Sequence, residues 1–329
     1  MEYTDYNGYL VAGTLKSDNA GFSKWAIAKK DGSEYFIKEF LSPVYPQNES
    51  MFSETQLEKK KKACAMYEAK KTLLYKTIND SSDGNSVRII DFFRCESRYY
   101  IVMPKIDSKK LTPAETSRMV QMDHYQQRLL CKTLAHSIYN LHQKGIVHGD
   151  LKWDNVLLGN SKMGWLVAKT IDFDNSFFES EPPHNPEEFN IDVVYLAPEG
   201  YLFLAGEDVK IGKPLDVFAM GIYFHLVFQG ELPTFESGTH YDYIFQGLLE
   251  GDTLEIGENV PPDLVELVRG MLEVDPVKRL SSKAVFEYLS GQKLDNAPEQ
   301  TATKNDKEAS VKINAYQKKM GKFKQAGNL

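Results

Sequence analysis

The stretch that decides the fold is His148 to Leu158, which reads HGDLKWDNVLL. It combines carboxylates, an ammonium group and the Asn155 amide just after a helical pattern that Gly145 ends. Seventeen residues beyond Asn155 a second acidic group begins, Asp172-Phe173-Asp174. Each piece alone is common on protein surfaces. Together they place acids, a base and an amide in a loop-rich region, and this region is the candidate centre of chemistry.

The composition is that of an ordinary globular protein. The chain has 329 residues, of which 42% are hydrophobic and 26% are charged, enough for one large two-lobed domain or two modest ones. Its cysteines, Cys64, Cys95 and Cys131, lack metal-ligand spacing and indicate reduced thiols. The sequence has neither an apolar run of about 18 residues nor the pattern of a secretory signal. We therefore expect a soluble, cytoplasmic protein.

The charge is unevenly distributed along the chain. The net charge is −7, and residues 105–289 carry 16 basic and 28 acidic side chains, hence 16 − 28 = −12. An acidic middle argues against nucleic-acid binding. It is compatible with basic protein partners and equally with a solvated surface.

The first hundred residues predict a small lobe of strands with one helix. Asp31-Gly32 separates two β-prone runs and predicts a hairpin. The expected strands are 9–12, 25–28, 35–38, 87–93 and 99–103, with the helix at 53–78.

Beyond Pro104 the pattern becomes helical. Apolar residues at helical spacing predict an amphipathic helix over 123–144. Later helices are expected at 215–229, 262–273 and 281–289. After residue 290 large apolar residues thin out, so 290–329 is predicted to be a flexible polar tail. Within it, Tyr316 to Lys324 could form a short basic helix on a partner.

The chain resembles the eukaryotic-type protein kinases over roughly residues 8–289. The resemblance implies a bilobal α+β fold with a β-rich N-lobe at about 8–103, a hinge at 104–107 and a mainly helical C-lobe at 108–289. Several motifs carry it in the family's order: Tyr35-Phe36-Ile37-Lys38, the catalytic loop from His148 to Asn155, Asp172-Phe173-Asp174, Ala197-Pro198-Glu199, the buried helix at 216–221, and Arg279.

The resemblance assigns catalytic roles to the central loop. Asp150 would accept the proton of the substrate hydroxyl or orient that hydroxyl, and Lys152 would reach the γ-phosphate. Asn155 and Asp172 would hold Mg²⁺, which favours hard oxygen ligands. The Asp-x-Lys arrangement is the Ser/Thr version of this loop.

The resemblance also assigns residues to the phosphates of ATP. Lys38 would bind the α- and β-phosphates. Glu68 is our candidate for holding Lys38 in place, because Leu73, Leu74 and Ile78 follow it in an expected core-facing stripe. Glu58 is the alternative.

Adenine contacts are expected from the connection between the lobes. Met103 corresponds to the gatekeeper, Pro104 supplies a carbonyl and Ile106 supplies an amide N–H. Proline retains its C=O and lacks only its N–H, so Pro104 fits this role. Leu157 completes the expected nucleotide contacts.

The Gly-rich phosphate loop of the family is largely absent. Asp18, Ala20 and Ser23 stand where glycine is expected. Glycine lets backbone amides approach phosphate closely, so this chain should bind ATP more weakly or by another loop path. The small residues Ala20, Gly21 and Ser23 still leave room for a nucleotide.

Other departures affect the predicted site. Trp25 and Phe36 are bulky where the family has small residues near adenine; either they crowd it or the lobe repacks around them. Gly149 replaces the Arg that gathers an activation-loop phosphate, so phosphorylation there is not expected to be a switch. Asp174 replaces a glycine, and Asp192 replaces a Thr, which could favour a basic substrate segment.

Two other readings remain open. A pseudokinase would keep the fold as an ATP-binding interaction module. A small-molecule phosphotransferase of the aminoglycoside or choline type also has His-Gly-Asp-Leu, although Ala197-Pro198-Glu199, Asp216 and Arg279 favour a protein substrate. We predict a Mg-ATP-dependent Ser/Thr protein kinase with no nucleic-acid or membrane partner; the sequence leaves its oligomeric state open.

Overall fold

The computed structural model describes residues 2–17, 23–106, 109–110, 119–161, 164–189, 191–294 and 302–326. The chain divides into two compact units between Asp107 and Ser108. This division falls at the end of the segment 104–107 that the sequence analysis expects to connect two lobes. None of the helices in these described ranges has the length and apolar character needed to cross a bilayer.

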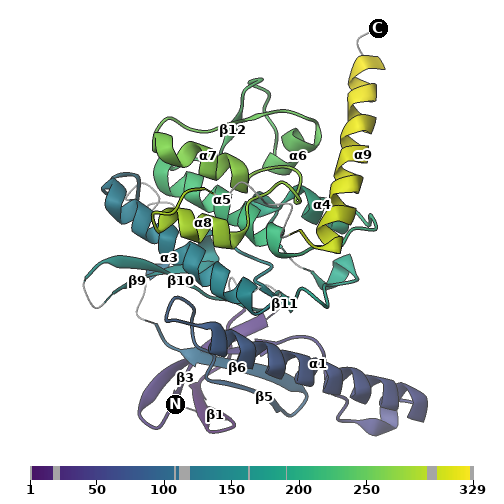
Figure 1. Cartoon of the computed structure of the whole chain (residues 1–329). Coiled ribbons are helices and arrows are strands. Elements are labelled where there is room, and N and C mark those ends of the chain that lie inside the picture. The colour runs from purple at the N-terminus through teal and green to yellow at the C-terminus, as the bar shows by residue number, and fades with distance from the viewer. Residues whose placement is uncertain are drawn as a thin grey trace. The chain divides into compact units, whose positions relative to one another are not determined.

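The first unit is built on a six-stranded antiparallel sheet with the order β1-β2-β3-β4-β6-β5 (Figure 1). Its edge strand β1 begins at Tyr3, before the predicted start of the lobe at residue 8. The strands are β1 (Tyr3–Tyr6), β2 (Tyr9–Ala12), β3 (Ser23–Lys30), β4 (Ser33–Phe40), β5 (Asp91–Cys95) and β6 (Arg98–Pro104).

The predicted hairpin joins β3 to β4. Asp31 and Gly32 have positive φ angles of 49° and 77°, as the tight turn between twisted strands requires. On the sheet face that includes Ile37, Tyr100 and Val102, side chains of β2, β3, β4 and β6 form a buried cluster. The hairpin signal in the sequence is therefore confirmed.

One helix, α1 (Glu54–Ser81), covers the other face of the sheet. Ser53 caps it in a capping box with Gln56, so the predicted start at residue 53 is close. Aromatic rings fill the contact: Tyr67 of α1 lies 6.4 Å from Phe40 of β4, between ring centroids. A short 3₁₀ turn, η1 (Glu49–Met51), precedes the helix.

The second unit surrounds a central helix, α5 (Lys213–Gln229). Every residue of α5 from Leu215 to Phe228 is buried, which explains its almost uniformly apolar sequence. The surrounding helices are α3 (His124–Gln143), α4 (Pro198–Leu204), α6 (Ile244–Leu249), α7 (Pro262–Met271), α8 (Ser282–Leu289) and α9 (Lys304–Ala326). Asp123 caps α3, and Gly145, with φ +69°, follows its end. The four helices predicted from the sequence correspond to α3, α5, α7 and α8.

Short strands and 3₁₀ turns connect these helices and form the loops of the candidate site. The short strands are β7 (Lys109–Lys110), β8 (Ile146–Val147), β9 (Val156–Asn160), β10 (Leu166–Thr170), β11 (Phe177–Phe178), β12 (Thr234–Phe235) and β13 (Leu254–Glu255). The 3₁₀ turns are η2 (Trp153–Asn155), η3 (Pro186–Glu188) and η4 (Val193–Tyr195).

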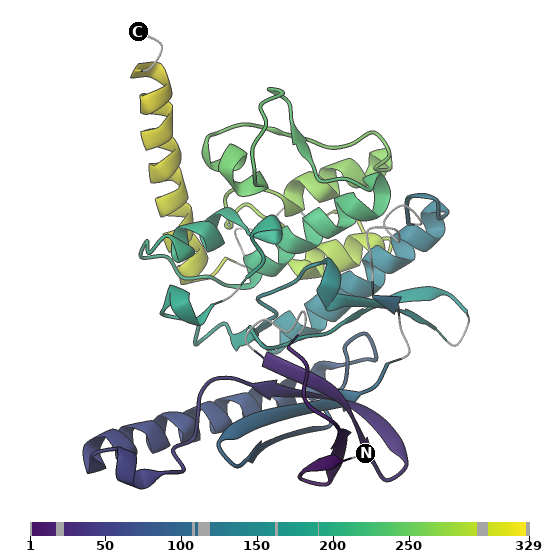
Figure 2. The same ribbon diagram turned by 180° about the vertical axis from the view of Figure 1, so that it is seen from behind.

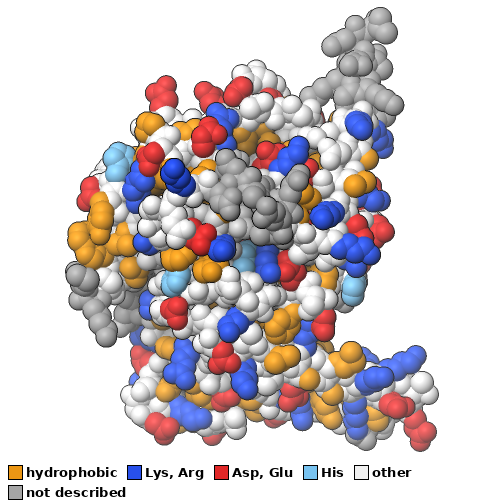
Figure 3. Space-filling view, in the orientation of Figure 1, with side chains coloured by type: hydrophobic (Ala, Val, Ile, Leu, Met, Phe, Trp, Pro, Cys, Tyr) orange, Lys and Arg blue, Asp and Glu red, His pale blue; other side chains and the backbone are white. Residues whose placement is uncertain are grey.

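The last helix, α9, corrects the expectation of a flexible tail after residue 290. Figures 1 and 2 show it lying along α4 and α6. Ala309 and Ile313 are buried against the unit, while its outward face carries charged side chains (Figure 3). Ala309, Ile313, Tyr316 and Met320 recur at helical spacing. That periodicity was the available signal, obscured by the Lys, Asn and Gln around it.

Candidate active site

One buried carboxylate fixes the loop that follows β8. Asp216 of α5 accepts hydrogen bonds from the backbone amides of His148, at 2.7 Å, and Gly149, at 2.9 Å. Its Oδ2 also lies 2.9 Å from Nε2 of His142, whose Nδ1 lies 2.8 Å from the hydroxyl of Ser282. Since Asp216 is 1% exposed, these partners replace the water that a buried carboxylate would otherwise need.

Gly149 occupies a backbone position that a side chain would disturb. Its φ is +81°, and a Cβ atom there would lie 2.6 Å from the carbonyl oxygen of Asn175. This contact gives a steric reason for glycine at the position where the family has arginine. The loop containing Asp150 and the loop after Asp172 meet at this point through their backbones.

The carboxylate of Asp150 is held by three neighbours. The side-chain amide of Asn155 donates to its Oδ2 at 3.0 Å and to its backbone oxygen at 2.7 Å. The ammonium nitrogen of Lys152 lies 3.2 Å from Oδ2, and the backbone amide of Asp192 donates to Oδ1 at 3.4 Å. Contacts to both carboxylate oxygens therefore fix the orientation of the Asp150 side chain.

Burial also tunes the acidity of Asp150. Desolvation raises its pKa, and the nearby carboxylate of Asp172 adds to the rise. The positive charge of Lys152 and the ring of His148 oppose it. A carboxyl group whose pKa is raised toward the working pH is a better general base than an ordinary surface aspartate.

Asn155 and Asp172 offer oxygen atoms that suit a divalent cation. Because the Asn155 nitrogen donates to Asp150, its amide oxygen remains as the acceptor of that side chain. Asp172 has φ 61°, and it precedes Phe173, which is buried against the ring of His148. A carboxylate with an amide oxygen is a fitting donor set for Mg²⁺.

This donor set relies on a bound phosphate to complete the coordination. Within the part of the chain that the structure describes, no group of three or more His, Cys, Asp or Glu residues could hold a metal ion. Magnesium commonly uses one or two carboxylates together with substrate phosphates and water. The residues present therefore fit a Mg-nucleotide better than a protein-only metal centre.

The segment after Asp192 is tied to the core by an ion pair. The guanidinium of Arg279 binds both oxygens of Glu199, at 2.6 and 3.0 Å, with both side chains almost fully buried. Arg279 also donates to the carbonyl of Pro214 at 2.9 Å. This buried ion pair joins two of the motifs named in the sequence, Ala197-Pro198-Glu199 and Arg279.

In the first unit, Lys38 is buried on the face of the sheet that α1 covers. Phe36 and Phe40 lie two residues before and after it on β4, so the three side chains share that face. The rings of Trp25 and Phe36 stack on each other, with centroids 5.5 Å apart. The two bulky residues therefore pack as a pair next to Lys38.

Glu68, the expected partner of Lys38, lies in the middle of α1. Its side chain is exposed. The buried residues of α1 include Leu74 and Ile78, as expected, whereas Leu73 is 57% exposed. Glu68 lies four residues after the buried Cys64 and seven before the buried Tyr75, so it is on the same side of the helix although its side chain is exposed.

The half-buried position one turn before Leu74 and Tyr75 is Lys71, not a carboxylate. Its ammonium lies 5.5 Å from the centroid of the Tyr75 ring. The alternative candidate, Glu58, is also exposed and lies in the first turns of α1, which have no buried residue before Cys64. Both acids that the sequence suggested have exposed side chains.

The remaining predicted nucleotide contacts are partly described. Met103 is buried at the end of β6, Pro104 ends that strand, and Ile106 is half-buried. Ser23 is buried at the start of β3, and Leu157 is buried in β9 of the second unit. Asp18, Ala20 and Gly21 lie outside the described residues.

The chain belongs to the protein kinase domain family. The family model for the protein kinase domain matches residues 47–289. This match begins after β4, so it does not include Lys38, and it ends with α8, so α9 lies beyond it.

Sequence relatives include several Ser/Thr kinases. The chain is 28% identical to the serine/threonine-protein kinase PSK2 of Saccharomyces cerevisiae over 64% of its length, and 30% identical to PSK1 of the same yeast over 60%. It is 30% identical to calcium-dependent protein kinase 3 of Oryza sativa over 55%. The aligned regions span only 18%, 13% and 32% of those proteins.

Proposed function

We propose that this chain is a Ser/Thr protein kinase that transfers the γ-phosphoryl group of Mg-ATP to a hydroxyl of a protein. The observation that carries the proposal is the fixation of Asp150, whose two carboxylate oxygens are held by Asn155, Lys152 and the amide of Asp192. Phosphoryl transfer needs positioning and electrostatics more than covalent chemistry. A rigid acceptor for the hydroxyl proton, with an ammonium group beside it, meets that need.

Each residue has a distinct role in this proposal. Asp150 orients the substrate hydroxyl and takes its proton. Lys152 stabilises the negative charge that develops on the transferred group. Asn155 and Asp172 would hold Mg²⁺, whose positive charge neutralises the phosphate oxygens when it is bound. Lys38 is proposed to bind the phosphates of the nucleotide.

We further propose that the acceptor segment is basic. Asp154 is exposed in the catalytic loop, and Asp192 is half-buried directly before η4. Burial raises the pKa of Tyr195, and the charges of Asp192 and Asp154 add to that rise, so both carboxylates lie near one ring. A substrate with Lys or Arg beside its hydroxyl would complement this local charge.

The test is transfer of label from γ-labelled Mg-ATP to the protein itself and to a basic protein acceptor. Asp150→Ala should lower turnover by about 10²–10⁴-fold through the loss of general-base help. Asp208→Ala, which removes an exposed carboxylate of the same unit, serves as the matched control. Phosphoserine or phosphothreonine should be the product.

Other outcomes would overturn the proposal. Binding of ATP without transfer to any protein would indicate an interaction module. Transfer confined to small hydroxylated amines would indicate a small-molecule phosphotransferase. Full activity of Asp150→Ala would remove this residue from the mechanism.

A further inference from the structure

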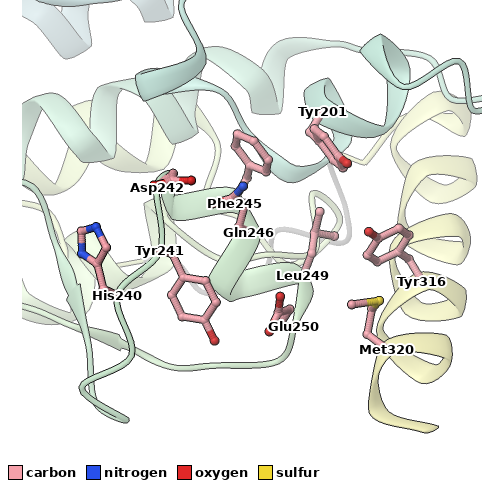
Figure 4. A pocket seen from close by; sticks show the side chains of 10 residues that line it. All are labelled: Tyr201, His240, Tyr241, Asp242, Phe245, Gln246, Leu249, Glu250, Tyr316 and Met320. Carbon is pink, nitrogen blue, oxygen red and sulfur yellow. The ribbon is translucent and has the colours of Figure 1, made fainter. Parts of the chain in front are cut away.

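Helix α9 completes a hydrophobic core beneath the segment that runs from Asp192 into α4. Ile313 and Ala309 of α9 are buried together with Leu196, Leu202 and Phe245. In Figure 4, Tyr316 and Met320 of α9 stand on one side of a groove of about 300 Å³, and Tyr201, Phe245 and Leu249 stand on the other. Tyr316 and Tyr201 also pack against this buried cluster. The segment therefore rests on α9 rather than only on the helices before it.

Polar contacts fix the register of α9 on this core. The hydroxyl of Ser310 donates to Oδ2 of Asp275 at 2.8 Å, and the side-chain amide of Gln317 donates to the carbonyl of Leu248 at 2.8 Å. Asp275 is buried, and its backbone oxygen accepts the amide of Arg279 at 3.0 Å. The helix is thus attached to the loop that carries Arg279.

Two routes lead from α9 to Asp150. In the first, Ile313 packs in the cluster with Leu196, which directly follows Tyr195; the backbone amide of Tyr195 donates to the backbone oxygen of Asp192 at 3.2 Å. The amide of Asp192 then donates to Asp150.

The second route is polar. Ser310 binds Asp275, whose loop holds Arg279 against Glu199 at the start of α4. Both ends of the segment from Asp192 to Glu199 are therefore supported by α9. Contacts of this kind transmit a displacement because packed interiors deform little.

We propose that α9 is a positioning element of the acceptor site, with Ile313 as its principal residue. This inference rests on the proposed kinase function. Loss of the Ile313 contact would let the segment 191–199 move away from Asp150 and weaken binding of the acceptor. The affinity for ATP would be unchanged, since the residues proposed to hold the nucleotide and its Mg²⁺ do not belong to this segment.

The experiment compares Ile313→Asp with Val311→Asp in the full chain. Both changes introduce a carboxylate two positions apart on one helix, but Val311 is 69% exposed whereas Ile313 is fully buried. Ile313→Asp should raise the KM for the acceptor by about 3- to 30-fold, the usual range for residues that act on a site from a distance. The KM for ATP should stay within about twofold, because a positioning role acts on one substrate only. The acceptor KM of Val311→Asp should match that of the wild type. The conservative change Ile313→Val, which keeps an apolar side chain, should also leave the acceptor KM near the wild-type value.

Hydrogen exchange gives a readout that does not need activity. The amides of residues 191–197 should exchange faster in Ile313→Asp than in Val311→Asp, while those of α5 stay protected. If Ile313→Asp does not fold, Ile313→Ala replaces it in both measurements.

Each outcome bears on a different claim. Unchanged exchange and unchanged acceptor KM in a folded Ile313 variant would overturn the role of α9. An equal rise of both KM values, or a loss of activity equal to the unfolded fraction, would also overturn it. If the wild type transfers no phosphate, the proposed function fails, and the exchange of residues 191–197 still decides whether α9 positions the segment.

Discussion

The α-carbon of Gly149 approaches the backbone of Asn175 so closely that a β-carbon would lie 2.6 Å from the Asn175 carbonyl oxygen. The two loops that carry Asp150 and Asp172 are therefore joined by a backbone contact. In addition, the hydroxyl of Ser176 donates to the carbonyl of His148 at 2.8 Å. The close approach to Asn175 therefore explains why position 149 holds glycine where the family has arginine.

Gly149→Ala should destabilise the protein more than Gly145→Ala. Both glycines have positive φ angles, +81° and +69°, so both changes carry a conformational cost of about 1–2 kcal/mol. Only Gly149 has a backbone atom in the way, because nothing lies within 4 Å of a β-carbon at Gly145. We expect an additional loss of about 1–3 kcal/mol from overpacking at Gly149. Urea unfolding of the two variants measures the difference, and equal values would contradict the steric explanation.

Lys152→Met should shift the acid limb of the pH–kcat profile to higher pH. A general base works when deprotonated, so activity falls as the pH drops through the pKa of Asp150. The Lys152 ammonium lowers that pKa and so opposes the effect of burial. Without the ammonium, the pKa rises further and activity is lost at a higher pH.

The pH profile of the Lys152 variant needs a charge-matched control. Lys144→Met removes an exposed ammonium just past the end of α3 and should leave the acid limb in place. A profile of Lys152→Met that coincides with the wild type would mean that Asp150 does not titrate in the rate-limiting step.

Arg279→Met should cost far more stability than Arg128→Met. Arg279 and Glu199 are almost fully buried, so removing the cation leaves an uncompensated charge, at a cost of about 3–5 kcal/mol. Arg128 pairs with Asp263 at the surface, where an ion pair contributes only about 0–1 kcal/mol. Thermal and urea unfolding measure both losses. A small effect at Arg279 would show that the buried pair is readily replaced by apolar packing.

Asp306→Asn should reduce the pH dependence of stability. Burial raises the pKa of Asp306, with the carboxylates of Glu179 and Glu199 adding to the rise; these are themselves paired with Lys213 and Arg279. The folded-state pKa of Asp306 exceeds its unfolded-state value. Between these two pKa values the folded protein therefore binds more protons than the unfolded chain. Stability then falls as the pH rises from about 4 through the folded-state pKa.

Asparagine keeps the acceptor for the Thr303 amide and hydroxyl but has no charge to bury. The stability of Asp306→Asn relative to the wild type, measured as the free energy of unfolding, should therefore be greater at pH 8 than at pH 4. Glu308→Gln, an exposed change on the same helix, should show no such trend. Parallel pH curves for the wild type and Asp306→Asn would exclude a buried charge at this position.

Much of the fold was predictable because its signals are local. Asp31-Gly32 defines the hairpin through backbone conformations that only a few residues adopt readily. Asp123 and Gly145 bound α3 for a similar reason. Short stretches of chain carry this information, and so the positions of these elements and the candidate catalytic loop could be predicted from the sequence.

For α1 and the β3–β4 hairpin, only the tertiary structure decided how the side chains pack. Leu73 precedes Leu74 by one residue, yet Leu74 is buried and Leu73 is exposed, because contacts such as that between Tyr67 and Phe40 decide which side of α1 meets the sheet. Trp25 and Phe36 stack on each other across two strands. Neither outcome is specified by a local pattern, since each depends on contacts between distant segments.

The sequence by itself determined the chemistry of this protein, and the tertiary structure decided what supports it. The proposed catalytic groups lie in His148 to Asn155 and at Asp172, and their pattern can be recognised in the sequence alone. By contrast, the requirement for glycine at position 149 is explained only by the nearby carbonyl of Asn175. The role proposed for Ile313 is explained only by its packing in the cluster with Leu196. The physical reason is that a functional group belongs to one residue, whereas burial and close packing belong to contacts between residues far apart in the chain.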